Sequence, residues 1–205
     1  SEKYALEDKV IKYYPQRITA LENRIEGLKQ DVETAKQHPK PTDDCFVGME
    51  VKGVFYSEKA EAGKAIIEAC KKMSSPEPIP LGKYRGFDTE LLFNSTERTY
   101  EVKLKGATSR NVTLGDDAYG NITRLDNGIE KFAESLTFAE NELENTQNQF
   151  EIAKKEVQKP FAQEENLKAK LSRLDELNIL LNMDKTENEI VGGEPDEGEK
   201  PQKSR

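Results

Sequence analysis

The residue types that build many catalytic and metal sites are scarce in this sequence. Its 205 residues include one histidine, two cysteines and no tryptophan. The histidine, His38, precedes Pro39 and has no second imidazole or thiol pair near it in sequence, so it cannot complete a zinc site or a catalytic base with its orienting partner. Cys45 and Cys70 stand in a chain without disulfide-scaffold composition, and we expect reduced thiols in a cytoplasmic protein. The prediction is a non-enzyme with no catalytic residue, metal or cofactor.

Long apolar runs are also missing. No stretch of about 18 apolar residues occurs, and no basic start is followed by an apolar segment, so we expect neither a membrane span nor a signal peptide. Only 35% of the residues are hydrophobic and 34% are charged, which argues against a single large core. Such a composition suits either disorder or elongated helices that expose most of their surface.

What the sequence does contain is a long seven-residue repeat, which favours the helices. The repeat alternates steps of three and four through Ile122, Leu125, Ile129, Phe132, Leu136, Ala139, Leu143, Thr146, Phe150, Ala153 and Val157. A shorter seam runs through Ile11, Tyr14, Ile18, Leu21, Ile25, Leu28, Val32 and Ala35. A repeat held this strictly is typical of a coiled coil.

The two seams predict an α+β fold in which an antiparallel helical hairpin, a coiled-coil stalk, carries a small inserted module at its tip. We divide the chain into an arm at 1–40, the module at 45–115, a second arm at 120–183 and a tail at 184–205. In this arrangement Ile25, Leu28 and Val32 face Ile129, Phe132 and Leu136 in antiparallel order. The Glu-rich, Gly- and Pro-punctuated tail is expected to be acidic and disordered.

Two prolines limit the helices. Pro15 fits best in the first turn of the first long helix, which leaves Glu2 to Tyr14 as a short helix or a kinked extension. Pro160 is expected to end or kink the second rod, which would be about 58 Å long. Beyond it, a further helix with Leu167, Leu171, Leu174, Leu177 and Leu181 could fold back on the rod.

The module changes the hydrophobic period from helical to alternating. Phe46–Tyr56 and Glu90–Phe93 are rich in strand formers, and Tyr100, Val102 and Leu104 alternate with charged residues. Asn111–Leu114 predicts a further strand after a turn at Gly106–Ser109. Between the strands we expect one helix with Ser57 as its N-cap and one apolar face, formed by Ala62, Ile66, Ala69, Cys70 and Met73.

Charge gives one hint of function. The chain carries a net charge of −8, but residues 45–115 hold eleven Lys and Arg against nine Asp and Glu. We predict that five of these cations share one surface that contacts nucleic-acid phosphates: Lys83, Arg85, Lys103, Lys105 and Arg110. The alternative is that lysines on a strand face only block edge pairing.

Three stretches carry a resemblance to a known family: PIPLGKYRGFDTELLF (78–93), YGNITRLDN (119–127) and LDELNILLNMDKTENEIVGGEPDEG (174–198). They resemble the C-terminal region of large bacterial proteins of conjugative mobile elements that fuse an N6-adenine DNA methyltransferase to a Swi/Snf-type helicase. The family's catalytic motifs, an Asn or Asp followed by Pro-Pro and an aromatic residue, and a phosphate loop with an acidic Mg²⁺ motif, do not occur in this sequence. The resemblance therefore implies a non-catalytic arm, and no catalytic residue is carried over.

Two function classes remain. In the first, the chain is an accessory arm whose module contacts DNA or the upstream helicase and methyltransferase domains of a parent protein. In the second, the coiled coil serves only as a spacer or joins a second copy into a homo-oligomer. The sequence does not separate them, because a hairpin within one chain and a bundle between chains use the same seam.

Overall fold

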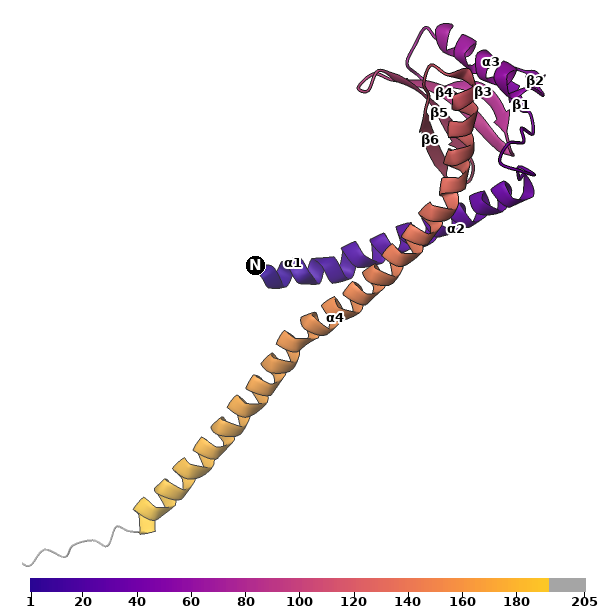
Figure 1. Ribbon diagram of the computed structural model, residues 1–205. Coiled ribbons are helices and arrows are strands. Elements are labelled where there is room, and N and C mark those ends of the chain that lie inside the picture. The colour runs from indigo at the N-terminus through magenta and orange to yellow at the C-terminus, as the bar shows by residue number, and fades with distance from the viewer. Residues whose placement is uncertain (192–205) are drawn as a thin grey trace, which may run out of the picture. The chain divides into compact units, whose positions relative to one another are not determined.

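The computed structural model describes the backbone of residues 1–191 and the side chains of residues 1–159 and 162–188 (Figure 1). The fold class is α+β, as predicted, with a six-stranded antiparallel sheet and long helices. The helices are α1 (Glu2–Asp8), the π-helical segment η1 (Lys9–Tyr13), α2 (Tyr14–Gln37), α3 (Lys59–Lys71) and α4 (Ala118–Val191). The strands are β1 (Met49–Val51), β2 (Val54–Tyr56), β3 (Ile79–Tyr84), β4 (Phe87–Asn94), β5 (Thr99–Lys105) and β6 (Ser109–Thr113).

The described chain divides into two compact units. One unit comprises Asp8–Glu151, which includes α2, the sheet, α3 and the first part of α4. The other contains Ser1–Glu7 and the chain from Ile152 onward. Within the second unit, the Lys3 ammonium lies 3.2 Å from the Glu164 carboxylate.

The strands follow the order β2-β1-β3-β4-β5-β6, and every neighbouring pair is antiparallel. Two of the hairpins close with two residues, Lys52-Gly53 and Arg85-Gly86, all with positive φ between 46° and 82°. This is the turn geometry that matches the right-handed twist of paired strands, and a glycine at the second turn position accepts it without strain. The Phe46–Tyr56 run thus contains two short strands, and β3 is a strand that we did not predict.

The core lies on one face of the sheet. Phe87, Leu91, Val102 and Leu104 point from β4 and β5 into a cluster with buried residues of α2, α3 and α4. The rings of Phe87 and Phe132 stack with centroids 5.1 Å apart. In α3 the predicted apolar face is buried at Ala62, Ile66, Ala69 and Cys70, while Glu58, not Ser57, precedes the first helical residue. Ser57 is therefore not the N-cap.

The first arm and α4 touch in antiparallel order within the larger unit. Tyr14 stacks on Phe150 with ring centroids 5.6 Å apart, and Arg17 pairs with Glu142. Further along both helices, Val32 lines the same small cavity as Ile129 and Phe132.

A buried carboxylate fixes α2 to the end of the sheet. Asp31 is 1% exposed and accepts hydrogen bonds from the backbone N–H groups of Ala107 at 2.7 Å and Thr108 at 2.8 Å. These residues form the turn between β5 and β6, which leaves Ser109 as the first residue of β6. The turn thus gains a fixed anchor on α2.

Pro15 lies in the first turn of α2, as predicted, and the chain before it continues as helix. The segment η1 adds one residue per turn relative to an α-helix, which rotates everything before it by about 100°. For this reason Ile11 leaves the seam and is 70% exposed, whereas Leu21, Ile25 and Leu28 are buried. The seam expectation is wrong at Ile11.

The second rod does not end at Pro160, because α4 runs through this position to Val191. A proline removes one backbone donor, and the flanking helix formers keep the remaining bonds. No fold-back helix forms, and the five leucines assigned to it are 47% to 58% exposed. Residues 184–191 are helical where we expected disorder, and the rest of the predicted tail, 192–205, lies outside the described residues.

Candidate functional site

Three of the five predicted cations lie on the open face of the sheet, opposite the core. Lys83, Asp88 and Lys105 stand side by side across β3, β4 and β5, and in the next row Glu90 of β4 lies opposite Lys103 of β5. The Lys105 ammonium lies 2.6 Å from the Glu90 carboxylate, which raises the pKa of Lys105. On this face Glu50, Asp88, Glu90 and Glu101 alternate with the lysines, so its charges nearly cancel.

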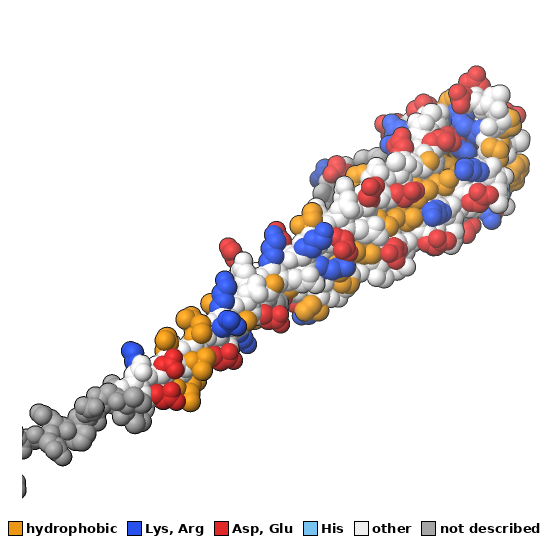
Figure 2. Space-filling model, turned by 90° about the horizontal axis from the view of Figure 1, so that it is seen from below, with side chains coloured by type: hydrophobic (Ala, Val, Ile, Leu, Met, Phe, Trp, Pro, Cys, Tyr) orange, Lys and Arg blue, Asp and Glu red, His pale blue; other side chains and the backbone are white. Residues whose placement is uncertain are grey.

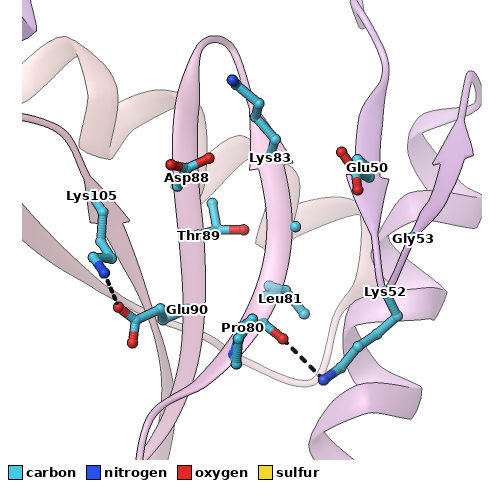
Figure 3. Close-up of a pocket in the computed structure, with 11 residues that line it drawn as sticks. Glu50, Lys52, Gly53, Pro80, Leu81, Lys83, Asp88, Thr89, Glu90 and Lys105 are labelled. Carbon is cyan, nitrogen blue, oxygen red and sulfur yellow. Dashed lines mark hydrogen bonds and ion pairs between the residues drawn. The ribbon is translucent and has the colours of Figure 1, made fainter.

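A shallow hollow of about 800 Å³ crosses this open face (Figure 3). Lys52, Lys83 and Lys105 line it together with Glu50, Asp88 and Glu90. The Lys52 ammonium donates to the carbonyl of Pro80 at 2.9 Å, so two of the three lysines already have an oxygen partner within the hollow. Balanced charges of this kind suit a mixed polar contact better than a polyanion.

Arg85 does not share that surface. Its side chain is 3% exposed and lies against α4, where one guanidinium nitrogen is 3.2 Å from Asp126 and another is 3.4 Å from Glu130. Its Nε donates to the carbonyl of His38 at 3.0 Å. The positive φ of Arg85, 46°, aims the side chain away from the open face and toward the helix.

Asp126 is the centre of this buried network. The carboxylate is 4% exposed and also accepts the Tyr84 hydroxyl at 2.7 Å, while Lys40 approaches it to 3.3 Å. Burial and the bond to Asp126 raise the pKa of Tyr84 far above its ordinary value, so the phenol stays protonated and keeps donating. Each side chain of the network has a hydrogen-bond or ion-pair partner. The network therefore connects the sheet to α4 and to the end of α2.

Arg110 lies on the core side of β6 and faces α4. Its guanidinium bonds to Ser135 and sits 5.8 Å from the centre of the Phe132 ring. The five predicted residues therefore do not share one surface, and that part of the prediction is wrong. Lys83, Lys103 and Lys105 are together, Arg85 is buried, and Arg110 lies apart. Strand alternation correctly predicted that the three lysines share one face. Arg85 lies in a turn with positive φ, and Arg110 lies opposite Leu104 on the core side of β6, so neither arginine is on that face.

Arg110 instead belongs to a groove between β6 and α4. This groove has a volume of about 330 Å³ and is lined by Arg110, Asn111, Val112, Thr113, Arg124, Asn127, Gly128 and Lys131. Three of these side chains are cations and none is a carboxylate. The close approach of α4 to β6 at Gly128, where a Cβ would lie 2.5 Å from Val112, sets the floor of the groove.

Two of the groove cations, Arg124 and Lys131, make few contacts with the rest of the protein, whereas Arg110 is held by Ser135 and the Phe132 ring. Arg124 and Lys131 are exposed, and the one bond from Arg124 reaches the Thr113 carbonyl at 3.4 Å. Arg110 is half-buried, and its Nε is enclosed without a hydrogen-bond partner. We call Arg110, Arg124 and Lys131 the basic groove. Sequence reasoning missed Arg124 and Lys131; their spacing of seven, which places them on one side of a helix, was the available signal.

The two cysteines and the single histidine are the residue types that most often bind transition metals or act as nucleophiles and bases. Cys45 and Cys70 are both free thiols, and burial raises the pKa of Cys70 to about 11, which disfavours a reactive thiolate. His38 ends α2 and donates from Nδ1 to the carbonyl of Thr34 at 3.0 Å. Among the described residues there is no group of three or more His, Cys, Asp or Glu that could hold a metal ion.

Comparisons with known proteins add no assignment. No family model matches the chain, and no match was found among curated proteins or solved structures. Within residues 1–191, none of the helices combines the length and apolar character needed to cross a membrane.

Proposed function

We propose that this chain is a non-catalytic accessory arm that contacts the DNA backbone through the basic groove between β6 and α4. The observation that carries the proposal is the unbalanced charge of that groove, which has three cations and no carboxylate among its lining residues. The open sheet face, where lysines alternate with acids, has no such excess.

The chemistry of the groove suits phosphate. The exposed guanidinium group of Arg124 offers forked donors that match phosphate oxygens, and the ammonium of Lys131 adds a point charge. Arg110, which is held by Ser135, adds positive charge to the lining of the groove. Asn127 in the wall supplies an amide group that can donate to sugar or phosphate oxygens, whereas the amide of Asn111 donates to Glu101 at 3.3 Å on the open face. Contacts of these types are independent of base sequence, so the expected binding is weak, non-specific and steeply dependent on salt.

The remaining parts of the chain fit an arm. We propose that α2 and α4 form an antiparallel coiled-coil stalk, which the Tyr14–Phe150 and Arg17–Glu142 contacts support. The three stretches at 78–93, 119–127 and 174–198 support a place beside the helicase and methyltransferase domains of a mobile-element protein. In that setting the arm acts in the cytoplasm and leaves the chemistry to those domains.

A salt titration of DNA binding tests the proposal. The full chain is titrated with duplex DNA by fluorescence anisotropy, and the variant Arg124→Glu with Lys131→Glu is compared with Lys103→Glu with Lys105→Glu. Both pairs exchange two exposed or half-exposed cations for acids, so the second pair is the matched control. We expect the groove variant to flatten the logarithmic salt slope by about two phosphate contacts and the control to leave it nearly unchanged.

Two results would count against the proposal. If only the Lys103 and Lys105 variant weakens binding, the open sheet face is the DNA surface. If the unmodified chain does not bind DNA at low salt, the arm docks on protein, and the hollow of mixed charge becomes the better candidate surface.

A further inference from the structure

The last third of α4 carries an apolar stripe with no cover from the described chain. Leu167, Leu171, Leu174 and Leu181 are 58%, 52%, 53% and 58% exposed. All described side chains from 162 to 188 are exposed. Figure 2 shows hydrophobic side chains gathered along the helix next to the grey segment.

This stripe continues the heptad register of the buried seam. Counting on by threes and fours from Phe132 and Ala139 reaches Leu167, Leu174 and Leu181 at one core position of the repeat, and Leu171 and Asn178 at the other. In the first part of α4 the same positions are buried, at Ile122, Leu125 and Ile129. A register kept beyond the intramolecular partner indicates that the stripe also has a helical partner.

We infer that the partner is a second copy of this chain, paired in parallel and in register along residues 167–181. The inference is independent of the basic groove and of DNA binding. In this pairing each leucine of the stripe meets its own equivalent, which removes both from water.

Asn178 supports this pairing over the alternatives. In a parallel, in-register pair the two Asn178 amides face each other and can exchange a hydrogen bond, as an asparagine at this core position does in two-stranded coils. An antiparallel pair centred between Leu171 and Leu174 places Asn178 against Leu167. A parallel pair shifted by one heptad places Asn178 against Leu171. Both leave a buried amide without a partner, which is unfavourable.

The flanking charges agree with the same geometry. Lys170 precedes the core residue Leu171, and Asp175 follows the core residue Leu174. In a parallel pair, side chains at these two flanking positions meet across the interface, so each Lys170 faces Asp175 of the other copy. Symmetry gives two such attractive pairs per dimer. Glu164 and Lys185 occupy core positions at the two ends, so the apolar contact is short and the association is expected to depend on concentration.

Leu177 lies beside the core, at the same kind of position as Lys170, and is 47% exposed. Ile179, Leu180 and Met183 lie further from the core positions of the repeat and are each 59% exposed. A two-stranded coil leaves them at its outer surface. They therefore provide a matched control, because Leu180 has the same chemistry as Leu174 and a similar exposure.

The first test measures the mass of the full chain by light scattering over a concentration series. We expect a rise toward twice the mass of one chain, lost in Leu174→Asn and kept in Leu180→Asn. A chain that remains monomeric at its highest soluble concentration would overturn the inference. Equal loss in both variants would overturn the heptad geometry, because the association would then use the whole apolar surface.

The second test reads direction and register. In a Cys45→Ser background, Leu171→Cys should form an interchain disulfide on mild oxidation, because parallel pairing brings the two thiols to the same level, and Leu180→Cys should not. Cys70 is buried and its pKa is raised to about 11, so this thiol can be kept. A dimer that forms no cross-link at 171 would overturn the parallel, in-register arrangement. Asn178→Leu should keep association but yield species larger than a dimer.

Discussion

The repeat in α4 passes through two stretches that have the same period and opposite surroundings. Between Ile122 and Ala139 its core positions are 0% to 1% exposed, except at the half-buried Leu136, whereas the core leucines between Leu167 and Leu181 are more than half exposed. The period alone therefore predicts that a face is apolar, and it does not tell which element covers that face. The first stretch is covered by other elements of the same chain, whereas no described residue covers the second.

The largest expected effect separates these stretches directly. Phe132 is 1% exposed and stacks on Phe87, so Phe132→Ala should lower the free energy of unfolding by about 3 to 5 kcal/mol. Leu174→Ala should change it by less than about 0.5 kcal/mol in dilute, monomeric samples. Urea denaturation followed by circular dichroism measures both, and equal costs would mean that the two stretches are equally enclosed.

The next effect concerns the polar side of the first stretch. Asp126→Asn keeps the shape of the side chain but leaves Arg85 with only the exposed Glu130 as a counter-charge, and we expect the free energy of unfolding to fall by about 2 to 3 kcal/mol. Glu130→Gln is the control, because the Glu130 side chain is 69% exposed and its ion pair with Arg85 should contribute less than about 1 kcal/mol. A similar cost for both variants would show that Asp126 is not the centre of the network.

The smallest effect lies at the end of the helix. Truncation after Met183 removes residues whose described side chains, 184–188, are all exposed, and the melting temperature should stay nearly unchanged. Differential scanning calorimetry of the truncated and full chains checks this. A clear drop in the melting temperature would show that the segment after Met183 is bound to something and that the second stretch is more enclosed than its first part suggests.

The sequence predicted the elements that depend on local pattern. The α4 helix, the α3 face and the alternation in β5 follow from periodicity, the position of Pro15 follows from its missing N–H group, and the structure contains all of them. The strand β3 was missed because Pro80 and Gly82 are poor strand formers, although β1 and β4 supply its partners on both sides. The Arg85-Gly86 turn was available as a hairpin signal.

The site was less accessible to sequence reasoning, because it depends on which parts of the chain meet. Arg85 is taken out of the surface by Asp126, about forty residues away. Arg110 joins Arg124 and Lys131 only because β6 packs beside α4. The predicted five-residue surface used cations from residues 45–115 only, whereas α4 supplies two of the three groove cations, Arg124 and Lys131.

The π-helical segment η1 has a consequence for comparing this chain with related sequences. A wide turn of this kind accommodates one additional residue while the helix on either side remains intact. Homologues that lack one residue between Lys9 and Tyr13 should therefore fold alike but carry an uninterrupted α-helix, with the residue at Ile11 returned to the seam. An alignment that forbids a single-residue gap in this helix would misassign every position before Tyr14, and with it the apolar face of the first arm.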